Sequence, residues 1–207
     1  PITHRDWAID LYDGVAIGST KVVGMGGTAM AHAEGAEGGH ANPATAGLRR
    51  ATSTGSFAWD FSFDALTARY SSDHDNNGED GTAGSSILYS ALPLQLGRGT
   101  LVSSALLRSM PLADTTPPLT VETSVGTAGL VRRWNGPGIA IGLGLRYAGL
   151  RLAGDRTYFS LEDTSAFAGA AWAPPGRTWR LGAALTTKSE PSTASYSGCD
   201  TENCMGL

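Results

Sequence analysis

The segment of the chain from residue 18 to residue 48 consists largely of glycine and alanine and ends in an Asn-Pro motif. These small residues bury little apolar surface, and glycine loses more backbone freedom on ordering than any other residue. The segment therefore cannot form a hydrophobic core of its own, and we expect other parts of the chain to surround it. Because β-type alternation begins after Arg50, we divide the chain into an N-terminal segment, 1–50, and a β-rich part, 51–207.

The clearest strand signal is residues 56–70, SFAWDFSFDALTARY. Successive side chains of a strand point to opposite faces of a sheet, so alternation predicts one apolar and one hydrated face. The apolar face carries Phe57, Trp59, Phe61 and Phe63, and the hydrated face carries Asp60, Ser62 and Asp64. A membrane barrel with a lipid-facing and a lumen-facing side needs this pattern, and so does a β-sandwich with one solvated face. In a barrel, Asp60, Ser62 and Asp64 are the lumen-facing candidates.

Further strands follow in pairs joined by short turns rich in glycine and proline. The predicted pairs are 87–96 with 100–110, 119–134 with 138–152, and 165–173 with 178–189. Pro93 cannot donate a ladder hydrogen bond, which predicts a bulge, an edge or a strand end at that position. The sequence thus predicts an all-β, antiparallel fold of about six strands.

Composition limits the class of protein further. Charged residues make up 16% of the chain and glycine contributes 28 residues, which is typical both of outer-membrane barrels and of secreted β-sandwiches. The net charge of -4 and the lack of a basic run exclude a nucleic-acid partner. No apolar stretch approaches the ~18 residues of a spanning helix. Trp134, Trp172 and Trp179 lie beside predicted turns, as in an interfacial aromatic girdle, and favour a membrane barrel.

No pattern of catalytic residues is found. The four histidines are scattered, no nucleophile motif is present, and Asp60 and Asp64 would lie roughly 13 Å apart along a strand, too far for a carboxylate pair. The glycine pattern at 24–29 lacks the βαβ context of a dinucleotide site. We therefore expect a protein that is not an enzyme and uses no cofactor.

Two short motifs predict local sites. Asp73, Asp75 and Asn77 have the spacing of the first half of a calcium loop, although Gly84 occupies the position of the final bidentate acid; a weak cation site and a hydrated loop tip are both compatible with this. Cys199 and Cys204 are close enough in sequence to form a small disulfide loop in an oxidising compartment.

The N-terminal segment resembles the signature of FadL/TodX-type outer-membrane transporters of hydrophobic compounds. The similarity includes the glycines at 24, 26 and 27, an acidic and small stretch, and the run from Asn42-Pro43 to Gly47-Leu48. Residues 92–111 and 166–191 resemble the strand-turn-strand units of that family, so the similarity covers most of residues 18–191. The resemblance implies a plug, shaped by Gly24, Gly26, Gly27, Asn42 and Pro43, inside a fourteen-stranded barrel of the bacterial outer membrane.

The resemblance also implies a function, which is passive passage of small hydrophobic ligands such as long-chain fatty acids through the lumen and a lateral opening in the wall. Two alternatives are a related outer-membrane barrel serving protein secretion or surface assembly, and a secreted, soluble β-sandwich binding module. About six strands are fewer than the eight of the smallest closed barrel, and the chain begins at Pro1, so we expect a partial barrel from a processed or truncated chain. The expected partners are a hydrophobic small molecule and the outer-membrane bilayer, and the sequence carries no signal for an oligomeric state.

Overall fold

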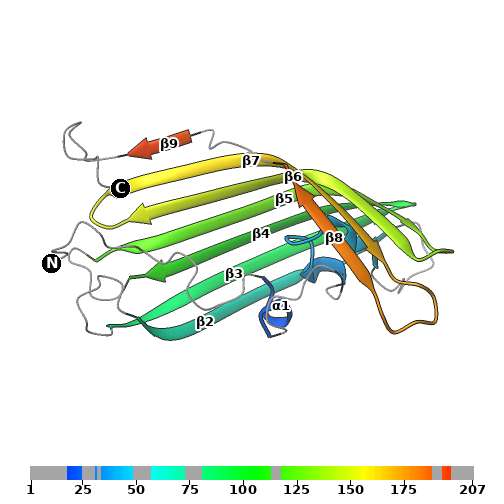
Figure 1. Cartoon of the computed structure of the whole chain (residues 1–207), viewed down its shortest axis with the longest axis horizontal. Helices are drawn as coiled ribbons and strands as arrows, with labels where there is room; N and C mark the ends of the chain where they lie inside the picture. Colours follow the sequence, from blue (N-terminus) through cyan, green and yellow to red (C-terminus); the bar gives the residue numbers. More distant parts are fainter. Residues whose placement is uncertain are drawn as a thin grey trace.

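One antiparallel sheet contains every strand in the part of the chain that the structure describes. This computed structural model describes residues 18–24, 31, 34–48, 57–72, 81–112, 118–187 and 193–196. The strands are β1 Phe57–Trp59, β2 Ser62–Ser72, β3 Gly81–Leu96, β4 Gly99–Pro111, β5 Thr120–Trp134, β6 Ile139–Ala153, β7 Thr157–Trp172, β8 Leu181–Thr186 and β9 Thr193–Tyr196. Figure 1 shows β2 to β7 side by side in chain order. The expected all-β, antiparallel fold is confirmed.

The nine described strands occupy seven positions in the sheet, because two of these positions each hold two short strands. Both β1 and β2 pair with β3, and both β8 and β9 pair with β7. The expected number of about six strands is therefore too small. Two predicted boundaries were also wrong, since β3 begins at Gly81 and β7 at Thr157. The first residues of both strands are polar, and in the sequence they resemble a loop. The described sheet is open, since the β1/β2 position and the β8/β9 position do not pair with each other.

The three predicted tight turns are confirmed. Gly97, Gly138 and Gly176 have φ values of 60°, 71° and 72°, a region that only glycine adopts without strain. These turns join β3 to β4, β5 to β6 and β7 to β8, so they lie at the same end of the sheet, which we call the turn end.

Pro93 lies inside β3 with a strand on each side, not at an edge or a strand end. The register is the same before and after it, since Trp59 pairs with Leu94 and Ser62 with Ala91, so there is no bulge either. The Asp60 N–H donates to the Pro93 carbonyl at 3.1 Å, but Pro93 has no N–H to return. This missing donor is why β1 and β2 are separate strands.

The N-terminal segment covers one face of the sheet, which we call the covered face; the opposite side is the outer face. Its described elements are α1 Thr20–Gly24, η1 Gly35–Glu37 and η2 Pro43–Leu48, and none of the described helices is long and apolar enough to cross a bilayer. Figure 1 shows α1 beside β2, η1 lies on β3, and η2 packs on β5, β6 and β7. The η2 contact is apolar: Ala44, Ala46 and Leu48 form a cluster with Val102, Val131, Ala140 and Ala171.

The sheet curls around this segment. Glu34 forms an ion pair with Arg180, next to β8, while Ala36 donates its backbone N–H to Asp60, next to β1, at 3.4 Å. Seven flat strands would hold their outer members about 29 Å apart, and three residues of extended chain cover only about 10 Å. Contacts from residues 34–36 to both ends of the strand order therefore agree with a curved sheet that has the N-terminal segment inside the curve.

Candidate functional site

The Asn-Pro motif fits into a notch formed by two glycines of the sheet. Gly142 of β6 and Gly169 of β7 are register partners on the covered face. A Cβ atom at Gly142 would lie 2.9 Å from the Pro43 carbonyl carbon, and one at Gly169 would lie 2.8 Å from Pro43 Cδ and overlap Asn42 Oδ1. The close approach of Asn42 and Pro43 to the wall is thus possible only because both wall residues lack side chains.

Asn42 is fully buried in this notch. Its amide nitrogen donates to the Ala170 carbonyl at 3.1 Å, and its amide oxygen accepts the Ala44 N–H at 3.0 Å. The Asn42 carbonyl also accepts the Thr45 hydroxyl at 2.8 Å. Asn42 therefore holds the first turn of η2 and attaches it to β7 at the same time.

The acidic row at the sheet edge faces the N-terminal segment. Asp60, Ser62 and Asp64 are half-buried on the covered face. Asp64 accepts hydrogen bonds from the Thr20 hydroxyl at 2.6 Å and the Ser62 hydroxyl at 2.7 Å. Of the residues that we expected to face a lumen, Asp64 thus binds Thr20 of α1 and Asp60 binds Ala36 of η1, while Ser62 binds Asp64.

Other polar contacts hold η1 from several sides. The Tyr89 hydroxyl donates to the Ala36 carbonyl at 2.5 Å, and the His40 ring meets the Tyr89 ring edge-on, with centroids 5.4 Å apart. Lys21 forms an ion pair with Glu37 at 2.7 Å. The Tyr89 contacts are buried and the Lys21–Glu37 ion pair is partly exposed, whereas the contact of η2 with the wall is buried and mostly apolar.

Beyond the N-terminal segment, the covered face is first polar and then apolar. Arg108 is buried there and donates to the Ser85 hydroxyl at 3.3 Å, and the Ser104 and Thr127 hydroxyls are 2.6 Å apart. At the end of the sheet away from the turns, a buried apolar group, which we call the far cluster, consists of Met110, Leu112, Leu119, Val121 and Leu152.

The outer face carries a belt of apolar side chains. The belt covers the nine residues nearest the turn end on β1/β2 and on each of β3 to β7. Within these stretches the outward side chains are mostly apolar, as the register and the alternating burial show. This apolar band consists of Phe57, Trp59, Phe61, Phe63 and Ala65; Leu88, Leu92, Leu94 and Leu96; Leu101, Ala105 and Leu107; Ala128, Leu130 and Trp134; Ile139, Ile141, Leu143, Leu145 and Tyr147; and Ala166, Ala168, Ala170 and Trp172. Its four aromatic residues on β1/β2 are 56–63% exposed.

Aromatic residues mark the border of the band at the turn end of the sheet. The Trp172 indole donates to the Pro137 carbonyl at 3.0 Å and meets the Trp179 ring edge-on, with centroids 5.1 Å apart. Arg132, the one charged residue pointing outward within the described band, lies next to this border, with its guanidinium 5.3 Å from the Trp134 ring centre. The tryptophans predicted to form a girdle thus do lie together at one end of the sheet.

Charged side chains appear on the outer face beyond the other border. We call this region the polar rim; it includes Arg69, Ser86, Ser109, Glu122, Ser124, Arg151, Ser160 and Glu162. Glu122 and Arg151 form an ion pair at 3.7 Å. At the start of β7, the Tyr158 hydroxyl donates to Asp155 in the β6–β7 turn at 2.9 Å, and this hydrogen bond raises the pKa of Tyr158.

The predicted site residues have different outcomes. Asn42 and Pro43 are in the notch described above, whereas Gly24 ends α1, where an added Cβ would meet no atom. Gly26, Gly27, Asp73, Asp75, Asn77, Cys199 and Cys204 lie outside the described residues. Among the described residues, no group of three or more His, Cys, Asp or Glu side chains is arranged to hold a metal ion.

Sequence reasoning missed the wall side of the notch and the contacts of Tyr89 and Arg180. A signal for the wall side was present in the sequence, since Ala140, Gly142 and Gly144 alternate with large apolar residues, a pattern typical of a close approach on one face of a strand. The identity of the second glycine was not predictable, because it depends on the β6–β7 register.

Comparison with known proteins gives no relative. Neither protein-family models, nor curated proteins, nor solved structures contain a match to the chain. The resemblance to FadL/TodX proteins stays a prediction from the sequence motifs.

Proposed function

We propose that the chain is part of a passive, non-enzymatic channel for hydrophobic small molecules, such as fatty acids, in a bacterial outer membrane. The apolar band is the observation that carries this proposal. It extends across β1/β2 and five further strands, with a tryptophan border on one side and a charged rim on the other. A soluble sandwich would cover such a surface with a second sheet, and the described residues provide none.

The height of the band agrees with a bilayer. A transmembrane strand tilted in a barrel needs about 9–11 residues to cross the hydrocarbon layer, and the band is nine residues long on each of these strands. Tryptophan rings with one hydrogen-bonding edge favour the interface between hydrocarbon and headgroups. The cation of Arg132, close to that border, reaches the interface along its neighbour Trp134.

The covered face supports passage of apolar molecules. The far cluster forms a buried apolar layer on the covered face at the end away from the turns; in outer-membrane barrels the end with the longer loops is the extracellular end. The N-terminal segment occupies the other end of the same face, as a plug does. Its small residues let it fit closely against the wall without a core of its own.

Uptake of a hydrophobic fluorescent tracer into liposomes tests the proposal. Liposomes that contain the protein should take up the tracer faster than protein-free liposomes. Leu119→Thr together with Leu152→Thr makes the far cluster more polar and should slow uptake several-fold. Ala105→Thr adds the same hydroxyl to the outer face and should not.

Two results would contradict the proposal. Inserted protein that passes no tracer would leave the secretion or surface-assembly alternative, and protein that stays in solution without vesicles or detergent would favour the soluble module.

A further inference from the structure

The turn end of the sheet carries positive charge without matching negative charge on its outer side. Each of the three tight turns lies in a stretch of sequence that contains no Asp or Glu; these stretches are residues 81–113, 123–154 and 164–189. The exposed cations at this end are Arg98 in the β3–β4 turn, Arg132 near the end of β5 and Arg177 in the β7–β8 turn. Among the residues that the structure describes, no carboxylate forms an ion pair with any of these three arginines.

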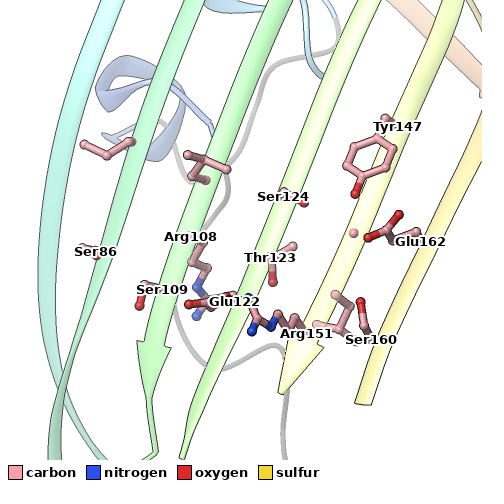
Figure 2. A pocket seen from close by; sticks show the side chains of 14 residues that line it. Ser86, Arg108, Ser109, Glu122, Thr123, Ser124, Tyr147, Arg151, Ser160 and Glu162 are labelled. Carbon is pink, nitrogen blue, oxygen red and sulfur yellow. Dashed lines mark ion pairs between the residues drawn. The ribbon is translucent and has the colours of Figure 1, made fainter. Parts of the chain in front are cut away.

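The polar rim, at the other border of the apolar band, has a different charge pattern. There Arg151 forms its ion pair with Glu122, and Glu162 lies on the neighbouring strand β7 (Figure 2). Carboxylates thus accompany the cations at the rim, whereas the outward cations at the turn end have none beside them.

Arg98 and Arg132 lie side by side at the ends of neighbouring strands. Arg132 on β5 is the register partner of Gly99 on β4, and Arg98 directly precedes Gly99. Neighbouring strands are about 4.8 Å apart, and like charges on neighbouring strands repel each other. An anion between the two side chains would remove this repulsion and accept charge-assisted hydrogen bonds from both guanidinium groups.

The tryptophans place these cations at the level of lipid headgroups. The Arg132 guanidinium lies 5.3 Å from the centre of the Trp134 ring, and stacking on a ring leaves the N–H edge of a guanidinium open to an oxygen acceptor. Arg177 lies two residues before Trp179. In a bilayer, tryptophans favour the interface between hydrocarbon and headgroups, which is where the phosphate groups of phospholipids lie.

We propose that the turn end binds the headgroups of anionic phospholipids, with Arg98 and Arg132 holding one phosphate between them. A zwitterionic headgroup brings an ammonium group that the unmatched arginines repel, so a lipid with net negative charge fits better. The acyl chains lie on Leu101 and Leu130, the next outward pair on the same two strands. Short turns of outer-membrane barrels face the periplasm, so the lipid belongs to the periplasmic leaflet. This inference rests on one premise of the proposed function, that the outer face meets lipid, and not on transport.

Native mass spectrometry of the full chain in polyoxyethylene detergent tests the inference. Phosphatidylglycerol and phosphatidylcholine with the same acyl chains are added in equal amounts, and the lipids that the protein retains are counted. We expect phosphatidylglycerol to be retained in preference to phosphatidylcholine. Arg98→Gln combined with Arg132→Gln should lower this preference by about fivefold for each arginine removed. Raising the ionic strength should weaken the preference of the unmodified chain, because salt screens exposed charges.

The matched control is Arg69→Gln combined with Arg151→Gln, which makes the same change in net charge at the polar rim. All four arginines are exposed, so both double variants should keep the fold, and the control should keep the preference for phosphatidylglycerol. An equal loss in both double variants, or no preference in the unmodified chain, would overturn the inference. Flotation with phosphatidylcholine liposomes separates the two proposals: protein that floats but shows no lipid preference refutes only this inference, and protein that does not float refutes both.

Discussion

At the scale of single residues, missing side chains fix where the N-terminal segment lies. Gly142 and Gly169 face each other across β6 and β7, and Asn42 and Pro43 occupy the space that their side chains would take. Asn42 then supplies hydrogen bonds to the wall and to its own turn. Close packing and hydrogen bonding thus fix the N-terminal segment at the same place on the wall.

Gly169→Ala should displace η2 from the wall. The new Cβ would overlap Asn42 Oδ1, and overpacking of a closely packed contact costs about 1–3 kcal/mol. Limited proteolysis of the N-terminal segment should become faster. The control is Ala168→Val, one residue away on the outer face, which should leave the cleavage rate unchanged; equal rates in both variants would contradict the notch.

Asn42→Ala should destabilise the fold by about 2 kcal/mol, because it removes the hydrogen-bond partner of the buried Ala44 N–H and of the partly buried Ala170 carbonyl. Denaturant unfolding in micelles measures this. Ser62→Ala, which removes a hydroxyl from a half-buried position, should have a smaller effect. A loss below that of Ser62→Ala would show that Asn42 does not hold the segment.

In the contact between the Asn-Pro motif and the wall, only the motif was predictable from the sequence. The Asn-Pro motif stands out in the sequence because its neighbours are small, and a buried asparagine must find partners. Its partners lie 128 positions away on β7, and they follow from strand register, which alternation of apolar and polar residues does not specify across long connections.

At the scale of secondary structure elements, one proline divides the first strand. Because Pro93 returns no hydrogen bond to Asp60, the ladder between β1/β2 and β3 is interrupted there while the register continues. The existence of most strands and of the turns was predictable from period-two alternation and from glycine, but β9 was not predicted. The ends of β3 and β7 were not, because polar residues at a strand end look the same as a loop.

Pro93→Val should join β1 and β2 into one strand. The new N–H faces Asp60 and completes the ladder, so backbone amides of residues 57–64 should exchange with deuterium several-fold more slowly. Hydrogen-exchange mass spectrometry measures this, with Leu92→Val as the control because it changes a neighbour that already has an N–H. Unchanged exchange in both variants would mean that the interruption has another cause.

The ion pair of Glu34 with Arg180 connects the residue before η1 to the start of β8, at the last position in the strand order. Both side chains are partly buried, so we expect a coupling energy of about 1 kcal/mol from a double-mutant cycle of Glu34→Gln and Arg180→Gln. Unfolding at low salt and high salt gives the measurement. The coupling should weaken with salt, and additive effects of the two substitutions would show that the pair does not stabilise the curl of the sheet.

At the scale of the whole molecule, the two faces of the sheet have opposite roles. The covered face binds the N-terminal segment, and the outer face presents the apolar band. Neighbouring strands alternate in direction, so the strands at the first and seventh positions run the same way and cannot pair with each other in antiparallel fashion. Within hydrocarbon their free edges require partners, and an all-antiparallel closure requires an odd number of further strands.

The central claim is that lipid, not water or another sheet, meets the apolar band, and the cost of a charge at two heights of β6 tests it. Leu143→Arg places the charge in the middle of the band, and Ala153→Arg places it on the same strand and face beyond the rim. In a bilayer, the first should cost about 2–4 kcal/mol of folding stability and the second about 1 kcal/mol or less. Denaturant unfolding in liposomes measures both, and equal small costs for the two variants would contradict the account.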